Sequence, residues 1–142
     1  MKNQKEYDEF LNSIGDEDAQ ILIDKIELFL NKNKMDNKVK SKFIALIGLV
    51  INVIGISLVD DYGYSYFKYA LELDEDNYFA MNMICSLFDT YPYPLNTLIT
   101  EREYLDVLEK LAMNFYDMDE ICQKNFLGTI KVYIKLRKKL IK

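Results

Sequence analysis

The chain has 142 residues and a formal net charge of −5, from 18 basic and 23 acidic side chains. Half of the residues are hydrophobic and 29% are charged, a balance that excludes a disordered chain and predicts a single domain over residues 1–142. The sequence has no histidine, which excludes imidazole-based catalysis and most zinc sites.

Long intervals without proline or glycine predict helices rather than short strands, because the sequence has only 2 prolines and 5 glycines. We therefore expect an all-α fold of about six to seven helices, arranged as antiparallel hairpins or as a helical bundle. Residues 4–14 predict a short first helix that ends near Gly15, and Asp16 can cap the next one. That second helix is expected from Glu17 to Asn31, followed by a polar connector over residues 31–38.

The most apolar segment covers residues 43–59, where seventeen consecutive residues carry no charge. Its length lies at the lower limit for a membrane-spanning helix, and the lysines that precede it would mark the cytoplasmic side. The chain beyond Val59 continues as amphipathic helix, which is typical of a packed helical domain. We favour a buried central helix and keep a single-pass membrane anchor over residues 43–59 as an alternative.

Turn and cap signals divide the middle of the chain. Residues 60–63 are expected to turn the chain before a helix from Tyr64 to Leu73. Asp76 or Asn77 can cap the next helix, which is expected from Tyr78 to about Asp89.

The last third of the chain predicts two helices after an irregular loop. Two prolines within residues 91–94 make this loop, because each proline removes a backbone donor and restricts the residue before it. Thr100 and Glu103 have the spacing of a capping box, which begins a helix that we expect to end near Tyr116. A final helix is expected from about Glu120 to Leu140.

Charge is unevenly distributed along the chain. The last twelve residues contain six basic side chains and no acidic one: Lys131, Lys135, Arg137, Lys138, Lys139 and Lys142. Residues 1–130 therefore have 12 basic against 23 acidic side chains, a net charge of −11. An acidic body favours a basic protein as the partner, and we expect neither nucleic acid nor a membrane in that role. The basic helix end is expected to be solvated. The alternatives are contact with the acidic body of a second copy in a homodimer, and contact with an anionic membrane surface or nucleic acid.

Small and aromatic residues recur at fixed spacing in the middle of the chain. Gly63, Phe67 and Ala70 follow a small–aromatic–small pattern along one predicted helix. A second pattern precedes them as Ile44, Ile47, Gly48 and Ile51, and it recurs after them as Met81, Ile84, Cys85 and Phe88. At these positions, residues 44–88 resemble a degenerate tetratricopeptide repeat. The chain departs from that pattern in having Glu75 where the repeat has proline, and a repeat of 37 residues instead of about 34.

The resemblance implies antiparallel helical hairpins and a protein-binding scaffold, because the family is chiefly known for protein and peptide recognition. The last helices fit the repeat poorly. A general helical bundle is the alternative, since small residues at helix contacts are equally expected there.

The sequence has no recognisable catalytic, nucleotide-binding or metal-binding motif. It lacks G-x-G-x-x-G and P-loop patterns, and the acidic run over residues 72–76 does not have the spacing of a calcium-binding loop. We therefore predict no enzyme activity, no cofactor and no metal site. Cys85 and Cys122 lie on apolar helical stripes and are expected to be buried, in a reducing compartment. The N-terminal residues are polar and acidic rather than a secretory signal, so we expect a cytoplasmic location.

Tyrosine is frequent, with 11 residues, and several tyrosines adjoin acidic residues in predicted turns. Such amphipathic aromatic side chains dominate the hot spots of protein interfaces. We predict a protein-binding surface that combines acidic and tyrosine residues: Asp60, Asp61, Tyr62, Tyr64, Asp74, Glu75, Asp76, Tyr91 and Tyr93. The four tyrosines of this set are expected to be exposed.

The predicted function is a non-enzymatic protein-binding module. Within that class we favour a small acidic inhibitor of the immunity or antitoxin type, which would mask a basic partner protein. The alternatives are a tetratricopeptide-like adaptor that binds a peptide in a concave groove, and a membrane-anchored protein that uses residues 43–59 as its span.

Overall fold

The computed structural model describes residues 19–54, 61–90 and 98–140, with the side chains of the last helix as far as Lys135. Within these ranges the chain is helical and has no strand, which confirms the all-α prediction. The elements are α2 (Ala19–Lys32), α3 (Asn37–Val53), α4 (Tyr64–Leu73), α5 (Tyr78–Thr90), α7 (Glu101–Met113), the 3-10 turn η2 (Phe115–Asp117) and α8 (Glu120–Leu140). The helix expected over residues 4–14, with Gly15 and Asp16, lies outside the described residues.

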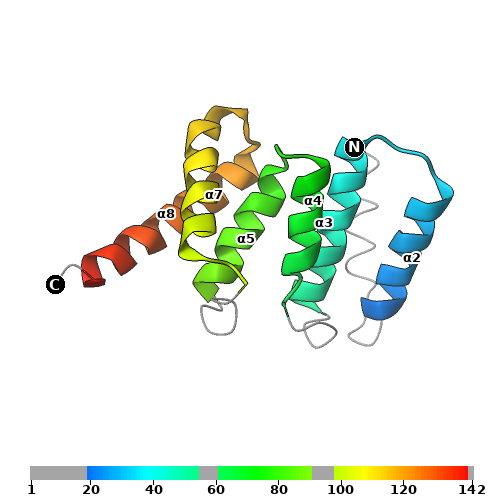
Figure 1. The fold of residues 1–142 in the computed structure, drawn as a ribbon, viewed down its shortest axis with the longest axis horizontal. Helices are drawn as coiled ribbons and strands as arrows, with labels where there is room; N and C mark the ends of the chain where they lie inside the picture. Colours follow the sequence, from blue (N-terminus) through cyan, green and yellow to red (C-terminus); the bar gives the residue numbers. More distant parts are fainter. Residues whose placement is uncertain (1–18, 55–60, 91–97, 141–142) are drawn as a thin grey trace.

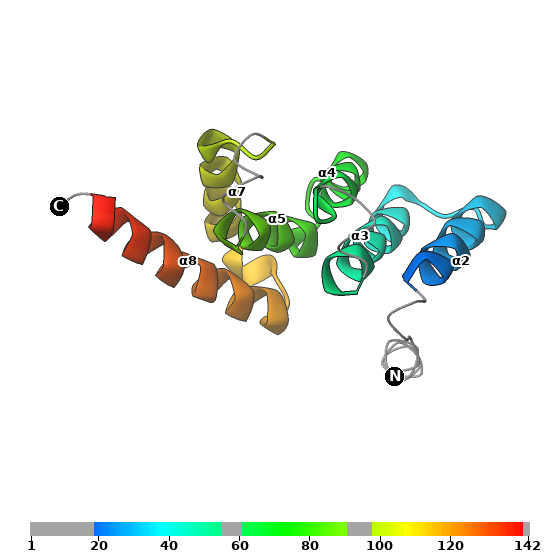
Figure 2. The ribbon, with the colours of Figure 1, turned by 90° about the horizontal axis from the view of Figure 1, so that it is seen from below.

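The helices form a row in chain order (Figure 1). Each of α2, α3 and α4 packs against the next helix along the chain, and α5 packs against both α7 and α8. Helices α3 and α5 run down in Figure 1 whereas α4 and α7 run up, so they form two antiparallel hairpins. In Figure 2, α4 and α7 lie along one side of the row and α3 and α8 along the other. The α3, α5 and α8 helices therefore share one face.

Helix α5 joins two clusters of buried apolar side chains. The first cluster contains residues of α2, α3 and α4, and α5 contributes Ala80, Ile84 and Leu87 to it. The second cluster contains residues of α7 and α8, and α5 contributes Met81 and Cys85. Because these five residues lie on two sides of α5, the helix is buried between the two parts of the molecule.

Two glycines lie where α3 and α4 cross. A Cβ atom on Gly63 would lie 2.6 Å from the carbonyl oxygen of Gly48, and a Cβ on Gly48 would lie 2.8 Å from the Phe67 ring. Gly63 also has a φ of 95°, in the left-handed region that favours glycine. The backbones of α3 and α4 therefore approach closely where Gly48 and Gly63 face each other.

A buried polar network links α3, α4 and α5. The Ser41 hydroxyl donates to the backbone carbonyl of Ala70 at 2.7 Å, and the Asn77 amide nitrogen donates to the Ser41 oxygen at 2.7 Å. The Asn77 amide oxygen accepts from the backbone N–H of Ala80 at 3.0 Å, which caps the start of α5. Ser41 is fully buried and Asn77 nearly so, and their polar groups have partners within the protein.

Several predicted bounds are confirmed because local signals determine them. Helix α4 has the predicted bounds, and so does α8. Asn77 rather than Asp76 caps α5, in keeping with one of the two predicted choices. The Thr100 hydroxyl caps α7 by accepting from the backbone N–H of Glu103 at 3.1 Å.

Two other predicted bounds are wrong. The connector expected over residues 31–38 is shorter, because the Asp36 carboxylate accepts from a backbone N–H in the first turn of α3 at 2.9 Å. The helix expected to reach Tyr116 ends before Asn114, whose backbone N–H and side-chain amide both donate to the Lys110 carbonyl. Both bounds depend on polar side chains that close a helix end.

The apolar segment is only partly a buried helix. Its first part belongs to α3, where these residues are buried: Ile44, Ala45, Ile47, Gly48, Val50 and Ile51. Phe43, Leu46 and Leu49 are half-buried and Val53 is exposed, so the expectation of complete burial is wrong for one side of α3. Residues 55–59 lie outside the described residues. Among the helices that the structure describes, none combines the length and the apolar character needed to cross a membrane.

Candidate functional site

The predicted surface is divided between the two ends of α4. Asp61, Tyr62 and Tyr64 lie at its start, whereas residues 74–76 form the turn that leads into α5. The ten residues of α4 separate the two groups by roughly 15 Å, so the structure does not bring them together. The remaining members of the set, Asp60, Tyr91 and Tyr93, lie outside the described residues.

Asp61 has a structural role at the start of α4. Its carboxylate accepts from the backbone N–H groups of Gly63 and Ser65, each at 3.0 Å, and from the Ser65 hydroxyl. The next residue, Tyr62, is half-buried, and its carbonyl accepts from the Asn52 amide at 3.3 Å. The predicted exposure of Tyr62 is therefore only partly met.

The predicted exposure of Tyr64 is wrong. Tyr64 is the first residue of α4 and is buried, and its hydroxyl donates to both carboxylate oxygens of Glu103 on α7, at 2.8 and 2.9 Å. Burial, with the Glu103 carboxylate beside it, raises the pKa of Tyr64. The Lys68 ammonium pairs with Glu103 at 2.7 Å. The Glu103 side chain thus contacts Tyr64 and Lys68 of α4. It therefore does not complete the predicted capping box with Thr100.

We expect the change Tyr64→Phe to lower the free energy of unfolding by about 1–2 kcal/mol, because it removes a hydrogen bond to a charged group. Glu103 keeps its contact with Lys68, which limits the loss. Tyr69→Phe is the matched control, since Tyr69 lies on the same helix, is 39% exposed and has no hydrogen bond to a described residue. Urea unfolding curves would measure both variants, and equal midpoints would contradict the role of the Tyr64 hydroxyl.

Lys110 of α7 holds the turn before α5 through a hydrogen bond and an ion pair. The Asp74 carboxylate accepts from the backbone N–H of Asp76 at 3.0 Å. The Lys110 ammonium donates to the Glu75 carbonyl at 2.6 Å and pairs with the Asp76 carboxylate at 3.7 Å. The acidic side chains of this turn point to different places: Asp74 and Asp76 border a groove on the α3 side, and Glu75 borders a cleft on the α7 side.

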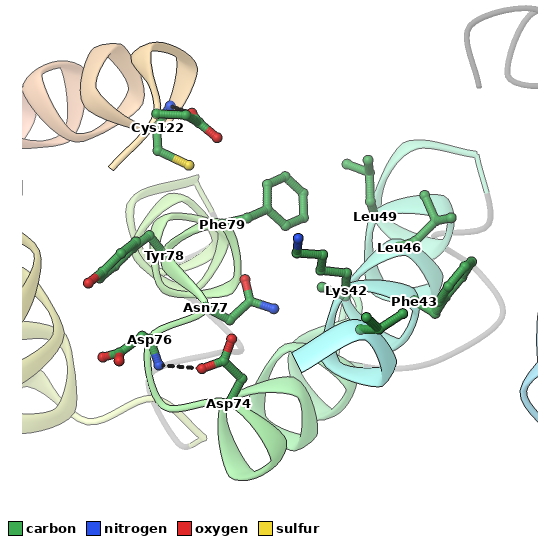
Figure 3. A pocket seen from close by; sticks show the side chains of 13 residues that line it. Lys42, Phe43, Leu46, Leu49, Asp74, Asp76, Asn77, Tyr78, Phe79 and Cys122 are labelled. Atoms are coloured by element: carbon green, nitrogen blue, oxygen red, sulfur yellow. Dashed lines mark hydrogen bonds between the residues drawn. The ribbon is translucent and has the colours of Figure 1, made fainter. Parts of the chain in front are cut away.

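That groove, the α3–α5 groove, is a hollow of about 640 Å³ on the face shared by α3, α5 and the start of α8. Its lining consists of Val39, Lys42, Phe43, Ala45, Leu46, Leu49, Asp74, Asp76, Asn77, Tyr78, Phe79, Asp119 and Cys122. Figure 3 shows Leu46 and Leu49 of α3 on one side and Phe79 projecting from α5 on the other. The half-buried side of α3 is therefore one wall of the groove.

The charge of the α3–α5 groove is predominantly negative. Among the described residues that line it, three carboxylates (Asp74, Asp76 and Asp119) accompany a single cation, Lys42. Lys42 forms no ion pair with any described residue. Asp119 also accepts from the backbone N–H of Cys122 at 2.8 Å, which caps α8. The groove thus combines an apolar wall with acidic residues along its edge.

The α4–α7 cleft on the opposite side of the row has a different electrostatic character. Three ion pairs occur beside its roughly 480 Å³ of space: Lys68 with Glu103, Arg102 with Asp106, and Lys110 with Asp76. Each of its cations is thereby neutralised by an acid of the same molecule. By contrast, the α3–α5 groove has two carboxylates, Asp74 and Asp119, that form no ion pair with a described residue.

The chemistry of the groove does not favour nucleophilic catalysis. Burial, with the adjacent Asp119 carboxylate acting in the same direction, raises the pKa of Cys122 to about 11. The thiol is therefore protonated near neutral pH, whereas a cysteine nucleophile must be a thiolate. In the part of the chain that the structure describes, no cluster of three or more acidic or cysteine side chains could hold a metal ion.

One feature of the sequence, the distribution of apolar residues around α3, is related to this groove, although the groove itself was not predicted from it. Apolar residues lie on every side of α3, a distribution that predicts burial of the whole helix. One side instead stays open because no described helix covers Phe43, Leu46 and Leu49 fully. The acidic edge had no such signal, since Asp74 and Asp119 come from turns far apart in the chain.

Comparison with models of protein families, with curated proteins and with solved structures finds no match for this chain. The resemblance to tetratricopeptide repeats therefore stays a prediction. The grooves and their charges are the basis for a functional proposal.

Proposed function

We propose that this chain is a non-enzymatic protein-binding module that holds a polypeptide segment of its partner in the α3–α5 groove. The observation that supports this is the combination of half-buried Phe43, Leu46 and Phe79 with acidic residues in the same hollow. Two of its carboxylates, Asp74 and Asp119, form no ion pair with a described residue, whereas Asp76 is paired with Lys110. Such a site suits a segment with apolar side chains and with lysine or arginine residues, because the charges are then complementary.

The dimensions of the apolar wall favour a polypeptide over a small molecule. From Val39 to Leu49 the wall follows α3 for roughly 15 Å, or about three helical turns. An apolar surface of this length can contact several apolar side chains in succession along one polypeptide segment. An amphipathic helix that binds in a hydrophobic groove makes contacts of this kind.

The proposal bears on the two protein-binding functions predicted from the sequence. A groove binder is closer to the peptide-binding adaptor, because Asp61 and Asp76 already contact other parts of the molecule. The acidic inhibitor is the narrower form of the same proposal, in which the basic segment belongs to the protein that is masked. The cytoplasmic location and the homodimer stay predictions.

We expect a peptide library displayed on phage to yield binders that carry apolar residues together with lysine or arginine. Their affinity should fall as the salt concentration is raised, because part of the attraction is between charges. Leu49→Lys would place a cation in the groove and should weaken binding by at least about tenfold. Asp74→Asn removes one carboxylate and keeps the acceptor for the Asp76 N–H, so it should have a smaller effect in the same direction.

Ile21→Lys is the matched control, because Ile21 is 52% exposed on α2 and does not line the groove. Fluorescence anisotropy with labelled peptides measures affinity, and circular dichroism checks that each variant is folded. The proposal is wrong if no sequence is enriched, if the enriched peptides are acidic, or if they bind Leu49→Lys and Ile21→Lys with the same affinity as the unaltered protein.

A further inference from the structure

A second hollow continues the shared face toward the C-terminal end of α5. This α5–α8 groove has a volume of about 370 Å³ and lies between α5 and the middle of α8, which pack against each other (Figures 1 and 2). Phe79 lines both grooves, so the two are adjacent along α5. The described residues that line the second groove include Asn82, Ser86, Asp89 and Thr129 but no lysine or arginine.

Asn82 is a nearly buried polar residue in the lining of this groove. The residue is only 4% exposed, and its amide nitrogen donates to the Tyr78 carbonyl at 3.0 Å, which fixes the orientation of the amide. Its amide oxygen has no hydrogen-bond partner within the described part of the chain. That oxygen has almost no accessible surface, so a ligand in the groove does not reach it directly.

Asp89 brings a negative charge to the same groove. Its carboxylate accepts from the Tyr104 hydroxyl at 2.7 Å and forms no ion pair with a described residue. Burial raises the pKa of Asp89, and the hydrogen bond from Tyr104 acts in the opposite direction. A half-buried carboxylate without a counter-charge is a favourable partner for a cation.

We propose that the α5–α8 groove is a subsite for a lysine or arginine side chain of the segment that occupies the α3–α5 groove. This inference rests on the proposed function. The segment follows α5 from Phe79 and directs its cationic group toward Asp89. Asn82 and Asp89 are seven residues apart, or roughly 10 Å along the helix, which an extended basic side chain reaches from a main chain that passes Asn82.

The subsite can be tested without knowledge of the partner, by NMR titration of the ¹⁵N-labelled protein with N-acetyl-lysine-N-methylamide. The corresponding norleucine compound has a similar stem and no charge, and it is the control ligand. We expect saturable shifts of residues in the α5–α8 groove with the lysine compound and much weaker ones with the norleucine compound. Asp89→Asn keeps an acceptor for Tyr104 and should weaken the binding roughly tenfold, the usual effect of one charge-assisted hydrogen bond.

Ser86→Lys is a second variant, at an exposed residue that lines this groove, and it should abolish the shifts. Met113→Lys is its control, because Met113 is 79% exposed and lines neither groove. Leu49→Lys should leave the lysine shifts intact, since Leu49 belongs only to the α3–α5 groove.

The outcomes separate this inference from the proposed function. Peptides that bind the α3–α5 groove, together with an absence of lysine shifts, would overturn the subsite alone. Lysine shifts without any peptide binding would overturn the proposed function and support a cation site. Equal shifts with both compounds, or unchanged shifts in Asp89→Asn and Ser86→Lys, would also overturn the subsite.

Discussion

Replacing Gly63 with alanine is expected to lower the free energy of unfolding by about 2–5 kcal/mol. Two costs add together. The φ of 95° is unfavourable for any residue with a Cβ, and that Cβ would lie 2.6 Å from the Gly48 carbonyl oxygen. Because the obstructing atom belongs to the backbone of α3, a side-chain rotation cannot relieve the clash, and α3 and α4 would have to move apart.

The control for Gly63→Ala is Gly128→Ala in α8. A Cβ on Gly128 meets nothing within 4 Å, and alanine is favoured over glycine inside a helix by roughly 0.5–1 kcal/mol. The two substitutions should therefore change stability in opposite directions, which urea unfolding would measure. A Gly63→Ala variant as stable as the unaltered protein would mean that α3 and α4 do not approach as closely as described.

Asn77→Ala is expected to lower the free energy of unfolding by about 2–4 kcal/mol, for two separate reasons. The first turn of α5 loses its cap, and the buried Ser41 oxygen loses the hydrogen bond that it accepts from the Asn77 amide. Water cannot readily replace this partner, because Ser41 is fully buried.

Thr100→Ala separates these two reasons. Thr100 is exposed and caps α7 through the backbone N–H of Glu103, so its loss should cost only the cap, about 1 kcal/mol. The difference between the two variants in urea unfolding then measures the buried part of the Asn77 network. If Asn77→Ala were no more destabilising than Thr100→Ala, the Ser41–Asn77 hydrogen bond would contribute nothing to stability.

Those parts of the fold that depend on neighbouring residues could be predicted from the sequence. The bounds of α4 and α8 follow from adjacent turn and cap residues, and the contact at Gly48 follows from a small residue within an apolar helix. The early end of α7 could not be predicted in the same way. It depends on the side-chain amide of Asn114, which donates to the Lys110 carbonyl in addition to the ordinary helical bond from the Asn114 backbone N–H. Asparagine in the sequence does not by itself require this contact.

The candidate site was much less predictable, because it depends on contacts between distant residues. Tyr64 stands next to a turn, which suggests exposure, yet it is buried by an interaction with Glu103, 39 residues away in the sequence. The acidic edge of the α3–α5 groove brings Asp74 together with Asp119 through the packing of α5 against α8. Periodicity and capping patterns carry no information about such pairs.

The position of α5 between two apolar clusters has a thermodynamic consequence. Parts of a protein that have their own buried clusters can open separately, with free energies below that of global unfolding. A segment in the α3–α5 groove would touch α3, which contributes to the first cluster, and Cys122, which belongs to the second. By linkage, a ligand that binds only when both parts are closed stabilises both at once. Occupation of the groove would thus convert two partly independent folding units into one more cooperative unit.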